Sequence, residues 1–148
     1  MARIFREKKG IKQILVSQRL KHPYLNALGL VTGKVKVGEK FEDEMIRECI
    51  EETGLVPTKF EMVGVARWID YDSKKTLLHD ATFIIFDVYE TDGVLIEQSD
   101  ESKNFWVDYS ELKNMDNLLP TLKEMAKGKE LQSRTMVFEE RVAVLDNF

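Results

Sequence analysis

The sequence lacks the features of a membrane protein, of a disulfide-stabilised protein and of a nucleic-acid-binding protein. A single cysteine among 148 residues excludes an internal disulfide and fits a reducing compartment. No apolar run approaches the roughly 20 residues that span a bilayer, and the charged segment Met1–Lys9 has no apolar core of a signal peptide. The net charge of −4 gives no general attraction to anionic membranes or nucleic acid. We expect a cytoplasmic protein with neither as a partner.

The composition is that of a soluble globular domain. With 43% hydrophobic and 32% charged residues, the chain is long enough for one domain with a core and too short for two ordinary ones. No linker or repeat divides it. We expect a single domain over residues 1–148, with residues 129–148 as a C-terminal extension that packs on the domain or on a second copy in a homodimer. In that extension Thr135–Phe138 has strand composition, and Glu139–Leu145 is compatible with a helix.

The stretch Gly33–Leu55 predicts a loop, one amphipathic helix and a glycine stop. Phe41, Met45 and Cys49 recur every fourth residue, as on a helix that faces a core. Gly54 stands where helices commonly end in a left-handed residue. We therefore expect this helix to pack one apolar stripe against a sheet.

Four glutamates gather on another arc of the same helix: Glu44, Glu48, Glu51 and Glu52. Like charges four residues apart destabilise a helix by about 0.2–0.5 kcal/mol per pair, and Arg47 relieves only part of this repulsion. Carboxylates that repel one another on one turn are what a hard divalent cation stabilises. A solvated charged face explains them equally well on helix geometry alone.

The spacing of the fixed residues distinguishes between these explanations. Every fixed position of the Nudix box is filled, by Gly33, Glu39, Arg47-Glu48, Glu51-Glu52 and Gly54-Leu55. The chain therefore resembles the Nudix hydrolases, enzymes that cleave nucleoside diphosphates linked to another moiety. Two departures are mild: Cys49 replaces a bulkier aliphatic residue, and Val31-Thr32 replaces the Pro-Gly that often precedes the first glycine.

The resemblance implies an α/β fold, the Nudix-like α/β/α sandwich with a mixed β-sheet. It also implies a metal-dependent pyrophosphohydrolase, in which water attacks phosphorus and cleaves the diphosphate linkage of a nucleoside triphosphate, ADP-ribose or a similar small-molecule nucleotide. Mg²⁺ is the expected cofactor, with Mn²⁺ as a substitute, because it suits carboxylate oxygens and substrate phosphates. The alternative is a catalytically inactive Nudix-fold module that binds nucleotides or regulates.

By the family pattern, Glu48, Glu51 and Glu52 are the metal ligands. Arg47 would orient these carboxylates through charge-assisted hydrogen bonds. Glu39 would brace the loop or bind an additional ion. The sequence does not choose among nucleotide substrates.

A polar loop ahead of the strand Phe105–Val107 offers a further acidic candidate. In many relatives a glutamate on this loop completes the metal site or serves as general base, and Glu101 best matches that position, with Glu97 and Asp100 as competitors. A solvated surface acid explains Glu101 equally well. The general base stays open among Glu48, Glu52 and Glu101.

Elsewhere the pattern predicts short strands and two closing helices. The strands are expected at Ile4-Phe5, Ile11–Val16, Leu28–Val31, Phe60–Ile69 and Ala81–Tyr89, and the helices at Ser110–Met115, capped by Ser110, and Asn117–Lys127. The chain from Thr82 to Phe86 is nearly continuous apolar sequence, which is typical of a strand buried on both faces.

Several residues outside the box admit a binding role, but packing or solvation is the simpler interpretation. Arg67 and Trp68 are adjacent in a strand and face opposite sides, so we expect the tryptophan to pack and the arginine to be solvated. His22 fits a surface loop, and Tyr24 fits the edge of the core. His79 has no evident partner in the sequence.

Overall fold

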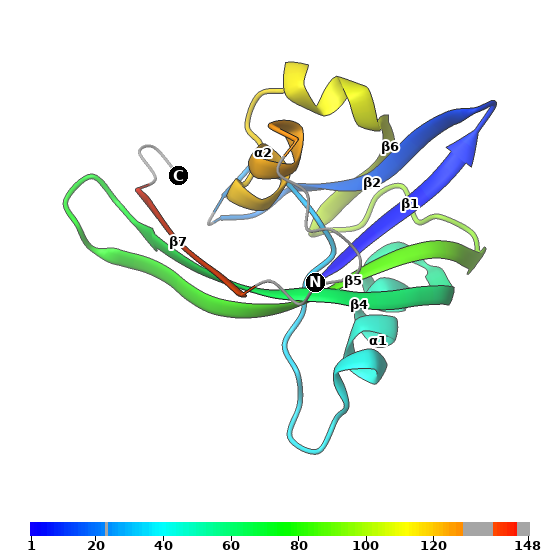
Figure 1. Ribbon diagram of the computed structural model, residues 1–148, viewed down its shortest axis with the longest axis horizontal. Helices are drawn as coiled ribbons and strands as arrows, with labels where there is room; N and C mark the ends of the chain where they lie inside the picture. Colours follow the sequence, from blue (N-terminus) through cyan, green and yellow to red (C-terminus); the bar gives the residue numbers. More distant parts are fainter. Residues whose placement is uncertain (23, 129–137, 145–148) are drawn as a thin grey trace.

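The chain forms a mixed sheet with helices on both faces (Figure 1). The structure, a computed structural model, describes residues 1–22, 24–128 and, by their backbone, 138–144. The strands are β1 Ala2–Lys8, β2 Ile11–Arg19, β3 Leu28–Gly29, β4 Leu55–Tyr71, β5 Leu77–Gly93, β6 Ser102–Asp108 and β7 Phe138–Val144. The helices are α1 Phe41–Thr53, the 3₁₀ helix η1 Tyr109–Asn114 and α2 Pro120–Ala126.

The sheet runs in the order β3-β2-β1-β5-β4-β7, and β6 pairs with β2. Two neighbouring pairs are parallel, β1 with β5 and β4 with β7, and the other pairs are antiparallel. The predicted mixed α/β sheet is therefore confirmed.

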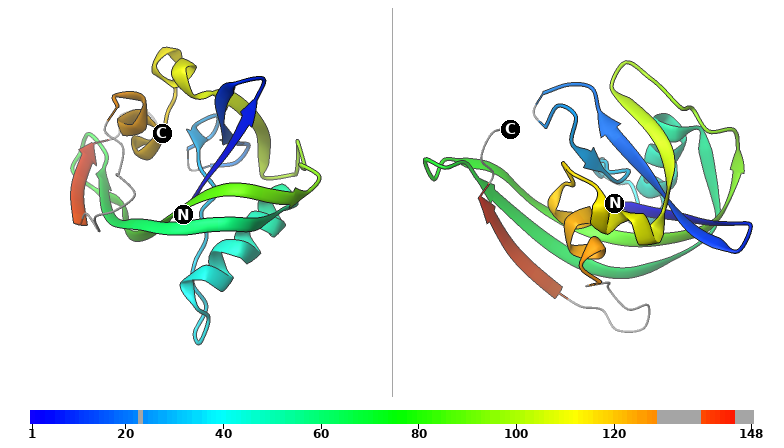
Figure 2. Two further views of the ribbon diagram at one scale, coloured as in Figure 1. Left: turned by 45° about the vertical axis from the view of Figure 1, so that its right-hand side comes forward. Right: turned by 90° about the horizontal axis from the view of Figure 1, so that it is seen from above.

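Helix α1 lies on one side of the β4–β5 ribbon, and η1 and α2 lie on the other (Figures 1 and 2). Each layer has its own apolar core. One cluster joins Met45 and Cys49 of α1 to Phe86 and Val88 of β5. The other joins Trp68 of β4 to residues of η1 and α2. The box helix α1 and the two C-terminal helices, η1 and α2, are thus held on opposite faces of the sheet.

The β4–β5 hairpin is longer than expected and projects beyond the rest of the sheet (Figure 1). Each strand has 17 residues, whereas the sequence predicted Phe60–Ile69 and Ala81–Tyr89. Register shifts near Pro57 and Gly64 absorb the two residues that disfavour regular strands.

The two C-terminal helices differ from the prediction at their N-terminal ends. Ser110 lies inside η1, which starts directly after Asp108, and does not cap it. Helix α2 starts at Pro120 and not at Asn117, because Asn117 has φ 58° and Pro120 fits the first turn.

Residues 138–144 are strand β7 and not a helix. They pair in parallel with β4 from Val65 to Tyr71, and this ladder pairs the backbone groups on the side that faces β4. Of the predicted strand Thr135–Phe138, Phe138 is the first residue of β7, and residues 135–137 lie outside the described residues. Within the part of the chain that is described, no helix combines the length and the apolar character needed to cross a bilayer.

Candidate active site

Helix α1 and the loop before it bring the box residues together. The helix ends as predicted, with Gly54 at φ 72° and its N–H donating to Ile50 O over 2.9 Å. The predicted apolar stripe is confirmed at Met45 and Cys49, which are buried, but Phe41 is exposed, and Glu44 of the acidic arc is only 4% exposed. The acidic arc therefore starts inside the protein at Glu44 and runs outward.

Arg47 organises the predicted carboxylates. Its Nε and Nη2 donate to the two oxygens of Glu39 over 2.8 and 3.1 Å. Its Nη1 donates to Glu48 Oε1 over 2.6 Å and to Glu51 Oε2 over 3.2 Å, and Nη2 also reaches Lys34 O over 3.2 Å. A planar guanidinium with five donors is suited to this fork-like arrangement.

The bond from Arg47, and then the backbone N–H of Lys36, lower the pKa of Glu39 to about 2. The same carboxylates raise the pKa of Arg47. Glu39 therefore remains ionised and ties the loop to the helix. Of its two predicted roles, this arrangement favours bracing the loop over binding a further ion.

Gly33 leaves the space that the Glu48 side chain occupies. A Cβ built at Gly33 would lie 2.0 Å from Glu48 Cδ, which is far inside van der Waals contact. The first glycine of the box is therefore required by the close approach of this carboxylate and not by a positive φ.

Glu52 is the box residue whose charge the fold disfavours most clearly. Burial first, and then the charge of Glu48, raise its pKa to about 7. A hydrogen bond from the Thr32 backbone and the charge of Arg19 act in the opposite direction. The result is a carboxyl group that exchanges a proton near neutral pH.

Asn104 holds the end of this helix, and sequence reasoning missed it. The side chain is 1% exposed, and its Nδ2 donates to Glu52 O over 2.8 Å and to Ile96 O over 2.9 Å. Thr53 O also accepts from Ile96 N over 2.8 Å. Asn104 is one polar residue in a strand, so it gives no periodic signal that would have revealed it.

Glu101 lies outside the carboxylate cluster. Its side chain is 78% exposed and pairs with Lys21 over 3.0 Å. Its charge nevertheless contributes to the raised pKa of Glu52. The competitors Glu97 and Asp100 are exposed as well. The structure thus brings Glu101 within electrostatic range of Glu52 without placing the two side chains in contact.

The oxygens of this site suit a hard divalent cation, although they are not gathered around one point. In the described ranges, no three Asp, Glu, His or Cys side chains form a ready metal-binding group, and Arg47 holds oxygens of Glu39, Glu48 and Glu51. The buried Glu52 beside Glu48 is nevertheless a pair that a cation would stabilise. Mg²⁺ needs only one or two carboxylates in addition to waters and phosphates, so the residues fit this ion.

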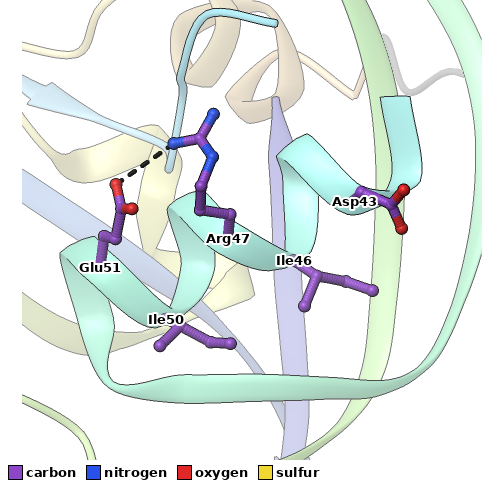
Figure 3. A pocket seen from close by; sticks show the side chains of 5 residues that line it. All are labelled: Asp43, Ile46, Arg47, Ile50 and Glu51. Atoms are coloured by element: carbon purple, nitrogen blue, oxygen red, sulfur yellow. Dashed lines mark hydrogen bonds and ion pairs between the residues drawn. The ribbon is translucent and has the colours of Figure 1, made fainter. Parts of the chain in front are cut away.

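A shallow hollow lies on the surface of α1. It is lined by Asp43, Ile46, Arg47, Ile50 and Glu51 (Figure 3). Arg47 and Glu51 point toward one another there, and their ion pair is drawn in the figure. Of the three candidate ligands only Glu51 lines this hollow, and Glu48 and Glu52 do not, so it is not where the three meet.

Comparisons with known proteins agree with this fold and box. The model of the NUDIX domain matches residues 1–128. The ADP-ribose pyrophosphatase of Methanocaldococcus jannaschii is 28% identical over 106 residues, which are 72% of this chain and 59% of that protein. The chain therefore spans less than two thirds of this curated relative.

Two solved structures have the same fold. The MutT protein of Bacillus halodurans superposes with a TM-score of 0.74 at 20% identity, covering 97% of this chain and 88% of that one. The NUDIX domain of Shewanella oneidensis NrtR, solved with ADP-ribose, has a TM-score of 0.68 at 20% identity and covers 86% and 84% of the two chains. The chain belongs to the NUDIX domain family, which confirms the family inferred from the box.

Proposed function

We propose that the protein is a pyrophosphohydrolase that uses a divalent metal to cleave the diphosphate linkage of nucleoside diphosphate derivatives. The observation that carries this proposal is Glu52, a half-buried carboxyl group with a pKa near 7 beside a second box carboxylate. Family membership supports the reaction class.

The side chains divide the work as follows. Glu48, Glu51 and Glu52 are the carboxylates that would hold Mg²⁺ or Mn²⁺. When bound, the ion neutralises the charge that builds on the phosphate oxygens. Arg47 keeps Glu48 and Glu51 oriented, and Glu39 fixes Arg47 from the loop side.

Glu52 is also a candidate to take a proton from the attacking water, because without metal its pKa lies near neutral pH. Glu101 is the second candidate for this role, through its electrostatic reach to Glu52. A pH–rate profile of Glu101→Gln distinguishes them. If Glu101 is the base, the limb of the profile that reports the base disappears in this variant.

ADP-ribose is the first substrate to test, because the curated relative is an ADP-ribose pyrophosphatase and a structural neighbour binds ADP-ribose. Nucleoside triphosphates, dinucleoside polyphosphates and nucleotide sugars complete the panel. With millimolar Mg²⁺ or Mn²⁺ we expect release of a nucleoside monophosphate. Nucleotide binding without turnover under either metal would instead identify an inactive binding module.

Glu52→Gln should lower the rate by about a hundredfold or more without loss of the fold. Glu42→Gln is the matched control, because Glu42 is an exposed acid on the same helix outside the fixed positions of the box. Full activity of Glu52→Gln would overturn the assignment of this residue.

A further inference from the structure

A second buried carboxylate, Asp70, lies outside the box near the end of β4. Asp70 is 5% exposed and pairs across the hairpin with His79 of β5. His79 Nδ1 lies 3.9 Å from Asp70 Oδ2, and the Tyr24 hydroxyl donates a hydrogen bond to the carboxylate. Tyr24 comes from the loop between β2 and β3, so three separate segments meet at Asp70.

One oxygen of this carboxylate makes no hydrogen bond within the part of the chain that the structure describes. Asp70 Oδ1 is buried and has no hydrogen-bond partner among the residues that the structure describes. Buried acceptors are costly when unpaired, and nearly all find a donor. Burial also raises the pKa of Asp70, against the opposing effects of His79 and Tyr24. A buried carboxylate with an unpaired oxygen lowers the stability of the fold, so we look for its role in ligand binding.

The surroundings of Asp70 suit the flat edge of a nucleobase. Trp68 lies two residues away on the same face of β4, and the Phe83 ring lies 6.1 Å from the His79 ring. The His79 side chain is 41% exposed and Tyr24 is half-buried, so the cluster reaches the surface through these two residues. Aromatic rings beside a hydrogen-bonding group are typical of sites that bind bases.

Arg19 connects this cluster to the box. Its positive charge acts on Glu52 and also on Tyr24. Glu52 and Tyr24, the hydrogen-bond partner of Asp70, therefore both lie within electrostatic range of one guanidinium. A nucleotide with its diphosphate beside Glu52 and Arg19 would extend its base toward Asp70.

We propose that Asp70 is a specificity-determining residue, whose Oδ1 accepts a hydrogen bond from the exocyclic amine of the substrate's nucleobase. The proposal rests on the nucleotide hydrolase function above. Adenine and guanine carry such an amine. Hypoxanthine carries none: in place of the adenine 6-amine it has a carbonyl oxygen, which a carboxylate repels, and in place of the guanine 2-amine it has a hydrogen. The enzyme should therefore discriminate against inosine nucleotides.

Matched substrate pairs test this preference. We expect kcat/KM to be about tenfold or more higher for ADP-ribose than for its inosine analogue, or for GTP than for ITP. Asp70→Asn should abolish or reverse the preference, because the amide offers a donor where the carboxylate only accepts. Asp80→Asn is the control. Asp80 pairs with Ile69 and so points to the opposite face, where it contacts Arg67.

Several results would overturn the proposal. One is a wild-type enzyme that shows no preference in either pair, and another is an Asp70→Asn variant that keeps the wild-type preference. If the wild type hydrolyses no nucleotide, the hydrolase function fails, but calorimetric binding of AMP, GMP and IMP without metal still tests Asp70. Equal affinity of the wild type for all three would then refute its role. This measurement needs no variant, so a folding defect of Asp70→Asn does not affect it.

Discussion

Replacing Glu52 by glutamine should stabilise the metal-free protein at alkaline pH while it lowers activity. The carboxyl group has an ordinary pKa of 4.5, which the fold raises to about 7. The folded state therefore holds the proton more tightly than the unfolded chain. Between these two values stability falls as the pH rises, because folding then requires an ionised group in an unfavourable site.

The size of this effect follows from the pKa difference. A change from 4.5 to about 7 corresponds to about 3 kcal/mol at 1.36 kcal/mol per unit. Glu52 is not fully buried, and solvent screening reduces the value, so we expect about 2 kcal/mol. Glutamine has nearly the same shape and no charge. The Glu52→Gln variant should match the wild type near about pH 4 and exceed it by about 2 kcal/mol near about pH 8.

Urea unfolding in the presence of a chelator measures this difference at each pH. Comparing variant with wild type cancels the other titrating groups. Glu51→Gln serves as control, because it removes a carboxylate from the same turn whose side chain is 56% exposed. A Glu52→Gln variant that is no more stable than the wild type at alkaline pH would refute the reasoning.

Three further substitutions test the site. Gly33→Ala should displace the Glu48 carboxylate, so that about 10–100-fold more Mg²⁺ is needed for half-maximal rate. Urea unfolding should change little, because the contact is with the end of a flexible side chain. Arg47→Lys keeps the charge but loses the fork, so Mg²⁺ titration should show a similar weakening, and an unchanged titration would exclude the orienting role. Asn104→Ala should lower the unfolding free energy by about 2 kcal/mol, since Glu52 O and a second carbonyl lose their donor; unchanged urea unfolding would contradict this.

The regular parts of the fold were predictable from local pattern. The period of α1 and its stop at Gly54 follow from nearest neighbours on a helix, and the structure confirms both. The burial of Glu44 was not predictable. Burial raises the pKa of this carboxyl group, and the charge of the Met1 amino group opposes that shift; no local pattern brings these two residues together.

The hairpin was underestimated for a different reason. Pro57 normally ends or weakens a strand, and the predicted strand started after it, at Phe60. Register shifts near Pro57 and Gly64 keep the ladder continuous over the whole of β4, because pairing with β5 outweighs local propensity. The parallel pairing of β7 with β4 joins segments that are far apart in the sequence.

Within the site, the box glutamates were predictable because their spacing is fixed on one helix. Asn104 and Asp70 were not, because each is a single polar residue in a strand. Their partners are distant: Asn104 meets Glu52, 52 residues earlier in the chain. Trp68 was correctly expected to pack and is buried. Arg67 was expected to be solvated; its side chain is 37% exposed and also pairs with Asp80 over 3.0 Å.

The hydrogen bonds of Asn104 also make the position of Glu52 independent of the loop that leads into β6. One amide group fastens both the last turn of α1, through Glu52 O, and the start of the loop that leads into β6, through Ile96 O. The loop residues between these two anchors can therefore change without moving Glu52 out of position. We expect insertions between Gln98 and Glu101 to leave Glu52 and the end of α1 in place.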